Sequence, residues 1–428
     1  MQIHVVQPGD TLWRISQAYG VNLNELVSSN EIPNPDRLVV GQTIVIPILG
    51  SYHWVTRGET LSQISERYGV SLEELVRINQ ISNPQNIPVG LRLYIPQKSR
   101  PAVDVSAYID PKITGAQSTE VIDQVAEHLT FLTVFQYSIN RDGTLDPVPN
   151  DQPLINAAYA HRTVPLMVVT NFEEGTFTTE LATAFFTDEN LQDQILDEAI
   201  RIMIEKGYLG LDFDIEYVGS QNRERYNQFL RKARRRVKEH NFFLSTALAP
   251  KLSGEQQGVL YEGHDYPAHG RIVDFIFFMT YEWGWSGGPP MAVSPINQVR
   301  GVLEYALSVV PRNKVMMGIP LYGYDWTLPY EPGGRRARSI SPQQAIELAA
   351  RYNAAIQYDT ESQAPFFTYT DEQNRRHEVW FEDARSIQAK FNLVKELGIR
   401  GFFYWVLGRS FPQNWLLVQD NFVVRKRV

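Results

Sequence analysis

Three acidic residues stand at alternate positions in the otherwise apolar segment YLGLDFDIEYV, residues 208–218. If this segment is a strand, Asp212, Asp214 and Glu216 project to one side and the apolar residues between them project to the other. Carboxyl groups this close cannot all stay ionised, so we expect at least one to be protonated near neutral pH. A protonated acid beside an ionised neighbour suits cleavage of a glycosidic bond. The alternative is an ion-pair network or a cation site.

The carboxylate segment belongs to a longer series of strand-like segments that alternate with helical patterns. Apolar residues keep helical spacing in 191–207 and 222–240, for example, and a strand-like segment follows each. Eight strands alternating with helices predict an α/β fold, a (β/α)8 barrel over residues 101–428, with functional side chains at the C-terminal ends of the strands. The segments are 104–110, 131–139, 164–172, 208–218, 242–250, 274–283, 314–326 and 398–408.

One connection in this series is too long for a simple helix. About 70 residues, rich in proline, glycine and polar strand-like pieces, separate the seventh segment from the eighth. We expect an inserted α+β subdomain at about 327–380 that walls the cleft of the barrel.

The first hundred residues contain an internal repeat with an offset of 49 positions. The stretch from His4 to Pro47 pairs without a gap with the stretch from His53 to Pro96. Each unit reads as a strand, two helices and a strand, and Thr11 or Thr60 can cap the first helix. The repeat predicts two small βααβ modules at 1–48 and 50–97, followed by a linker that begins at Gln97.

The motifs of these units resemble the LysM module: G-D-T-L or G-E-T-L leads, and N-P and then V-G-x-x-(I/L)-x-I-P follow. The resemblance implies binding of N-acetylglucosamine units of peptidoglycan or chitin in a groove between two loops. The alternative for Thr11 and Thr60 is a capping role alone. The residues carried over to this groove are Gly9, Asp10, Thr11, Leu12, Asn30 and Ile32 in the first module, and Gly58, Glu59, Thr60, Leu61, Asn79 and Ile81 in the second.

The large domain resembles glycoside hydrolase family 18 over residues 101–428. D-x-D-x-E ends the fourth strand segment, MTYE at 279–282 resembles the family's M-x-Y-D, and YWVLG at 404–408 supplies a tryptophan at the eighth strand. The resemblance implies retaining, substrate-assisted catalysis, in which the acetamido group of the substrate is the nucleophile. No cofactor is implied.

The family resemblance also implies a role for each acid. Glu216 protonates the leaving oxygen and later activates water, and Asp214 stabilises the oxazolinium intermediate. Asp212 shares a proton or hydrogen bond with Asp214, and Tyr281 orients the acetamido oxygen. Residues expected to contact the sugar are Tyr108, Asn171, Met279, Glu282, Trp283, Tyr322 and Trp405, of which Met279 and Trp405 form the floor of the pocket. The aromatic members could instead be core or rim packing.

This sequence departs from the family pattern at three places. Leu209 stands where an additional innermost acid is usual, and Glu282 stands where Asp is usual. The third strand segment ends in VTNF and lacks the small-residue S-x-G-G pattern. We expect little effect from Leu209, a different reach for Glu282, and Asn171 to contact the sugar in place of the glycines.

Composition narrows the classes of partner. The net charge is −8, and the basic residues that do cluster belong to an amphipathic helical segment. Both observations argue against a nucleic-acid binder. No window has the roughly 18 uninterrupted apolar residues of a membrane helix. The chain has no cysteine, and its eight histidines form no H-x-H or H-E-x-x-H pattern, so we expect no metal site.

Two LysM-like modules, no cysteine and no visible export signal together resemble the cortical-fragment-lytic group of this hydrolase family in bacterial spores. The resemblance implies an enzyme made in the mother cell without a signal peptide and laid down at the spore exterior, outside the cortex. We expect the enzyme to be a monomer. Since muramic lactam has no acetamido group, cleavage must follow N-acetylglucosamine, which makes a β-N-acetylglucosaminidase. The alternatives are a chitinase acting on chitooligosaccharides and a non-catalytic glycan-binding lectin.

Overall fold

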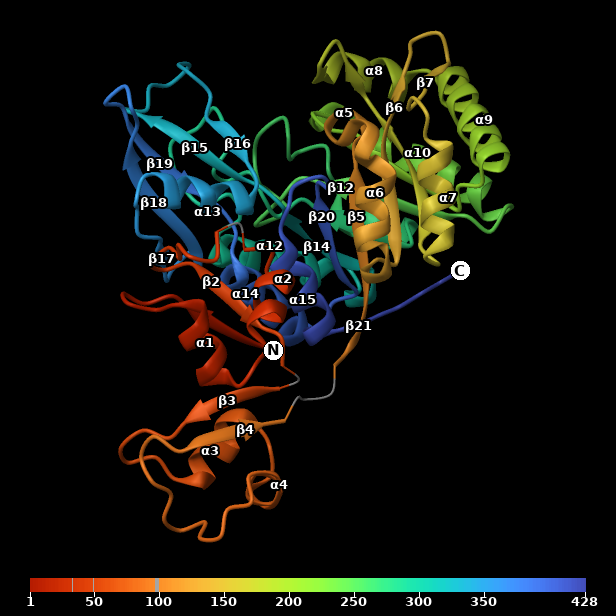
Figure 1. The fold of residues 1–428 in the computed structure, drawn as a ribbon. Coiled ribbons are helices and arrows are strands. Elements are labelled where there is room, and N and C mark those ends of the chain that lie inside the picture. The colour runs from red at the N-terminus through yellow and green to blue at the C-terminus, as the bar shows by residue number, and fades with distance from the viewer. Residues whose placement is uncertain (33, 49, 97–99) are drawn as a thin grey trace.

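Eight parallel strands close into a barrel in the computed structural model, which describes residues 1–32, 34–48, 50–96 and 100–428 (Figure 1). The barrel closes because β5 pairs with both β20 and β6. The predicted (β/α)8 fold is therefore confirmed. The strands are β5 (Ala102–Ile109), β6 (Phe131–Ile139), β8 (Val164–Thr170), β11 (Gly210–Asp214), β12 (Phe243–Leu248), β13 (Phe275–Phe278), β14 (Val315–Pro320) and β20 (Gly401–Trp405).

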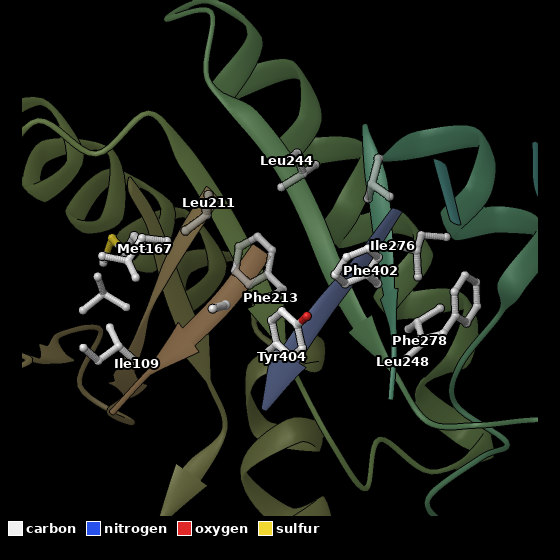
Figure 2. Packing of buried hydrophobic residues seen from close by; sticks show 14 of the residues in the cluster. Ile109, Met167, Leu211, Phe213, Leu244, Leu248, Ile276, Phe278, Phe402 and Tyr404 are labelled. Atoms are coloured by element: carbon white, nitrogen blue, oxygen red, sulfur yellow. The ribbon is translucent and has the colours of Figure 1, made fainter. Parts of the chain in front are cut away.

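Helices cover the outside of the barrel. The apolar residues that alternate with the acids of β11, Leu211 and Phe213, point outward into the layer between strands and helices, together with Leu244, Ile276 and Phe402 (Figure 2). A second apolar cluster fills the barrel interior, so the alternation expected from the sequence holds for this strand. The helices are α5 (Pro111–Thr114), α6 (Ser118–Val125), α7 (Gln152–Ala160), α8 (Thr179–Thr187), α9 (Glu189–Lys206), α10 (Arg223–Lys238), α11 (Tyr266–Ile272), α12 (Ile296–Val309), α14 (Ala384–Leu397) and α15 (Pro412–Asn421).

A five-stranded antiparallel sheet is inserted between β14 and β20. It is the insertion expected between the seventh and eighth strands. Its strand order is β16-β15-β19-β18-β17, and α13 (Pro342–Arg351) packs against it through a separate apolar cluster. Its strands are β15 (Gly323–Leu328), β16 (Arg338–Ile340), β17 (Gln357–Asp359), β18 (Ala364–Thr370) and β19 (Arg376–Trp380). Short additions elsewhere are β7 (Leu145–Asp146), β9 (Phe172–Glu173), β10 (Thr176–Phe177) and β21 (Val423–Val424).

Two βααβ modules precede the barrel, as the repeat predicts. Gly20 and Gly69 end the first helix of each module with a left-handed backbone, the conformation that glycine adopts most easily. The elements are β1 (Gln2–Val5), α1 (Leu12–Tyr19), α2 (Leu23–Ser29) and β2 (Thr43–Ile46) in module 1, and β3 (Ser51–Trp54), α3 (Leu61–Tyr68), α4 (Leu72–Ile78) and β4 (Arg92–Ile95) in module 2. Gln97, where the predicted linker begins, lies with residues 98 and 99 outside the described part of the chain.

Module 1 is docked on the barrel, and module 2 lies beyond it (Figure 1). Strand β2 is buried along its whole length against α14 and α15. The buried Gln413 side chain on α15 donates to the carbonyl of Thr43 at 2.7 Å and to the amide oxygen of Asn30 at 3.1 Å. Module 2 contacts module 1, where Tyr52 and Gln2 exchange two hydrogen bonds. None of the helices in the described ranges is long and apolar enough to cross a membrane.

Candidate active site

A pocket of about 240 Å³ opens at the C-terminal ends of the barrel strands. It gathers seven of the residues predicted from the sequence, and it adds six others. The predicted residues are Asp214, Glu216, Met279, Tyr281, Glu282, Trp283 and Trp405, and the added ones are Phe135, Phe177, Ala249, Pro250, Leu260 and Tyr261.

Asp212 lies below the pocket, fully buried on β11. Tyr108 on β5 donates to one of its oxygens at 2.7 Å, and Ser245 on the neighbouring β12 donates to the other at 2.6 Å. Burial raises the pKa of Asp212 to about 6, while these two donors favour the ionised form and oppose the shift. Asp212 is therefore mainly a carboxylate at neutral pH.

Asp214, two residues further along β11, lacks such donors. Its Oδ1 atom is buried without a hydrogen-bond partner among the described residues. Burial, followed by the charges of Glu216 and Asp212, raises its pKa well above the ordinary value for an aspartic acid. We expected Asp212 to share a proton or hydrogen bond with Asp214; no hydrogen bond joins them among the described contacts, and the Asp212 oxygens accept from Tyr108 and Ser245. The raised pKa of Asp214 favours its protonated form beside the Asp212 carboxylate.

Glu216 lies two residues past the end of β11, not on the strand as its spacing suggested. The side chain is partly buried and lines the pocket. Burial, and then the charge of Glu282, raises its pKa to about 7. A carboxylic acid that still holds its proton near neutral pH can act as a general acid.

Glu282 faces the same pocket from the segment after β13. The hydroxyl groups of Tyr322 and Tyr324 both donate to its Oε1 atom, the latter at 2.9 Å. Its backbone φ of 67° lies in the left-handed region, which is uncommon for a residue with a side chain. Burial raises its pKa. The two tyrosines thus hold an acidic group at a fixed place opposite Glu216.

Tyr281 and the remaining apolar wall complete the pocket. Gly318 allows the Tyr281 ring to pack against β14, since an added Cβ atom would come within 2.8 Å of that ring. Met279, Trp283 and Trp405 line the pocket as expected. The pocket therefore combines three carboxyl groups and two phenols with aromatic surface, a composition suited to a sugar ring.

Three residues predicted to contact the sugar do not line the pocket. Tyr108 is buried under the pocket and supports Asp212, and Tyr322 supports Glu282. Asn171 is fully buried, and its amide is used in hydrogen bonds to the backbone of Glu216 and Thr178. In each case a strand-end position predicted proximity to the site, but the side chain bonds to one of the acidic residues of the site and does not line the pocket.

The six added residues come from segments that carry no sequence motif. Phe177 stands on the β9–β10 hairpin, while Leu260 and Tyr261 belong to the long segment between β12 and α11. Phe135 lies in the middle of the predicted strand 131–139, where the pairing of β6 with β8 is irregular between Val134 and Tyr137. No group of three or more His, Asp or Glu side chains in the described ranges is arranged to hold a metal ion.

The residues predicted for glycan binding in the modules have mixed positions. Thr11 and Thr60 cap their helices, Thr60 in a reciprocal capping box with Gln63. Asn30 and Asn79 each bond to the backbone of the closing strand, so these two amides brace the module and are not open to a ligand.

The other residues predicted to bind glycan differ in how far they are buried. Leu12, Ile32 and Leu61 are core residues, and Ile81 packs against the core of its module. Asp10 and Glu59 accept from the imidazoles of His4 and His53, both at 2.9 Å. Gly9 and Gly58 both have a backbone φ of 87° at the turn before the helix.

An open groove does exist on module 1. It is lined by Asp10, Thr11 and Leu12, by residues of α2, and by Pro35, Asp36 and Leu38. Trp13 was not among the residues predicted from the sequence to bind glycan, but it also lines the groove and is 62% exposed. Module 2 has Ser62 at the equivalent position.

Comparisons with known proteins agree with this geometry. Residues 171–409 match the family described as Glycosyl hydrolases family 18, and residues 4–47 and 53–96 match the LysM domain. The chain is 57% identical to the Cortical fragment-lytic enzyme of Bacillus subtilis (strain 168), over 100% of this chain and 99% of that protein. It is 46% identical to the protein of the same name from Bacillus anthracis, over 100% of both. The crystal structure of the spore cortex-lytic enzyme SleL of Bacillus megaterium QM B1551 superposes with a TM-score of 0.92 at 46% identity, covering 100% of this chain and 99% of that one.

Proposed function

The chain belongs to glycoside hydrolase family 18, and from this premise we propose that it is a β-N-acetylglucosaminidase that cleaves spore-cortex peptidoglycan fragments during germination. The observation that carries the proposal is the pocket in which Glu216 and Asp214 face an aromatic wall with Asp212 below them. Full-length similarity to cortical fragment-lytic enzymes supports the choice of substrate.

The first step is protonation of the glycosidic oxygen. Glu216 gives its proton to that oxygen, and the C1–O bond breaks as the acetamido carbonyl oxygen of the same sugar forms a bond to C1. The leaving chain departs with the proton, and the sugar remains as an oxazolinium ion. Tyr281 donates to the acetamido oxygen and orients it. Asp214, whose Oδ1 atom has no protein partner, accepts from the acetamido N–H.

The second step returns the proton. The Glu216 carboxylate takes a proton from water, the hydroxide forms a bond to C1, and the bond between C1 and the acetamido oxygen breaks. The single negative charge of the Asp212–Asp214 pair stabilises the cation between the two steps. No side chain forms a covalent bond to the sugar. The reaction retains the configuration at C1 because C1 is attacked twice.

The bond that is cut follows from this chemistry. The sugar that supplies C1 must carry a 2-acetamido group, and the muramic lactam of cortex does not. Cleavage therefore follows N-acetylglucosamine. We assign glycan attachment to the groove of module 1, with Trp13 as a stacking surface, and we expect the protein at the outside of the cortex.

The test is the variant Glu216→Gln, which keeps the size of the side chain and removes the acid. We expect it to bind cortex fragments and to release no new reducing ends. Mass spectrometry of borohydride-reduced wild-type products should show N-acetylglucosamine at the new ends. Muramic acid at those ends, or substantial turnover by the variant, would refute the proposal. Preferential turnover of chitooligosaccharides would indicate a chitinase, and binding without turnover by the wild-type protein would indicate a lectin.

A further inference from the structure

The backbone at Glu216 is not paired with a neighbouring strand of the barrel. The last paired residues of β11 and β8 are Asp214 and Thr170. The next two residues of the chain lead to Tyr217, whose φ of 52° is unusual for a residue with a side chain. Sheet hydrogen bonds therefore cannot fix the position of Glu216, and other groups must do so.

The side chain of Asn171, the first residue after β8, forms hydrogen bonds to the backbone of Glu216 in place of strand pairing. Its Nδ2 atom donates to the carbonyl of Glu216 at 2.8 Å, and its Oδ1 atom accepts from the N–H of Glu216 at 3.0 Å. Nδ2 also donates to the carbonyl of Thr178 at 2.9 Å. The fully buried amide thus gives Glu216 the two backbone bonds that a continued β8 would have given.

His264 holds the residue before Glu216. Its Nδ1 atom accepts from the N–H of Ala249 at 3.0 Å, so the proton is on Nε2, which donates to the carbonyl of Ile215 at 3.0 Å. Burial lowers the pKa of His264 to about 4, and this imidazole therefore keeps a single proton at neutral pH. Its ring ties the end of β11 to the end of β12.

We propose that Asn171 and His264 are positioning residues that hold the backbone of Glu216 and thereby fix its carboxyl group at the glycosidic oxygen. The inference rests on the proposed role of Glu216 as the acid. Neither side chain lines the pocket, so each acts on the substrate through the backbone that it holds: that of Glu216 for Asn171, and those of Ile215 and Ala249 for His264. Loss of either one lets the Glu216 side chain leave its partly buried site.

Kinetics and pH dependence distinguish this role from a merely structural one. In Asn171→Ala we expect kcat to fall about 100-fold, the effect of a misplacement of about 1 Å, with KM within about twofold of wild type. The groups that face Glu216 are Asp214, Glu282, Tyr281 and Tyr217. Burial is the main cause of the high pKa of Glu216, so a more exposed side chain should move the descending limb of the pH profile to lower pH.

Asn222 provides a matched control. It is also a fully buried asparagine, and its Nδ2 atom donates at 2.9 Å to the carbonyl of Val218, two residues beyond Glu216. Asn222→Ala should lower the unfolding temperature and leave kcat and the descending limb unchanged. His264→Gln keeps a donor for the carbonyl of Ile215 and should recover about tenfold of the kcat lost in His264→Ala.

Five outcomes decide the question on the full-length protein. Loss of kcat with a shifted limb in Asn171→Ala, and neither change in Asn222→Ala, supports the proposal. Wild-type kcat in Asn171→Ala, or equal loss in Asn222→Ala, overturns it. Equal activity of His264→Gln and His264→Ala overturns the role of His264. Turnover by Glu216→Gln in the same series would instead overturn the assignment of the acid.

Discussion

Replacing Tyr108 by phenylalanine should make the Asp212–Asp214 pair more basic. The substitution removes the hydroxyl group that donates to Asp212 at 2.7 Å and keeps the ring, which packs against Phe277 and Phe403. A hydrogen bond to a charged group contributes about 1.5–3 kcal/mol. Since 1.36 kcal/mol is a factor of ten in proton affinity, Asp212 should bind its proton roughly ten- to a hundredfold more tightly.

The direction of the effect on activity follows from the charge that the intermediate needs. The pKa of Asp212 is about 6 in the intact protein, and the donor holds it below the value that burial alone would set. Without the donor, Asp212 becomes protonated at higher pH, and the pair loses its negative charge. The ascending limb of kcat/KM against pH should therefore move up from about 6, toward the descending limb that Glu216 sets at about 7. The maximum should also fall as the two limbs meet.

Tyr226→Phe is the control for this experiment. Tyr226 is fully buried near the same carboxylates, but its hydroxyl group has no hydrogen-bond partner among the described residues. Its removal should leave both limbs in place. The assay is release of reducing ends from soluble cortex fragments between about pH 4 and pH 9. An ascending limb in Tyr108→Phe that coincides with the limb of Tyr226→Phe would refute the assigned charge of Asp212.

Three further predictions concern other contacts. Glu282→Gln removes a negative charge that raises the pKa of Glu216, so the descending limb should move to lower pH, and an unchanged limb would contradict the coupling. Gln413→Ala removes buried hydrogen bonds between module 1 and α15, each contributing about 0.5–1.5 kcal/mol, and calorimetry should show a lower main transition. Trp13→Ala should weaken co-sedimentation with insoluble cortex about two- to tenfold at unchanged kcat on soluble fragments, whereas Ser62→Ala should change neither.

Periodicity in the sequence was sufficient for the barrel and for the central acids. The alternation of acidic and apolar residues in 208–218 identified Asp212 and Asp214 as inward-facing because one strand has a fixed period of two. The same rule failed at Glu216, where the strand has already ended. The rule also could not show that the Asn171 side chain bonds to the backbone of Glu216 and does not line the pocket. Asn171 follows one strand and Glu216 follows the neighbouring strand, and a period within one strand carries no information about contacts between two.

The docking of module 1 was not predicted, although a signal for it exists. Its closing strand reads TIVI and is buried throughout, whereas the equivalent RLYI of module 2 has an exposed arginine at its first position. A continuous apolar strand indicates burial on both faces. Leu260 and Tyr261 gave no comparable signal, since only tertiary structure brings their long segment to the pocket.

Because module 1 is docked on the barrel, module 2 is attached to the rest of the protein at both of its ends. Module 2 follows module 1 in the chain and precedes the barrel, so both of its ends lead back to the same body. A domain held by one flexible linker sweeps a volume that grows with the linker, whereas a domain held at two ends sweeps very little. A glycan bound to either module therefore stays at a high effective concentration near the pocket, and successive cuts should fall within a short stretch of the same strand.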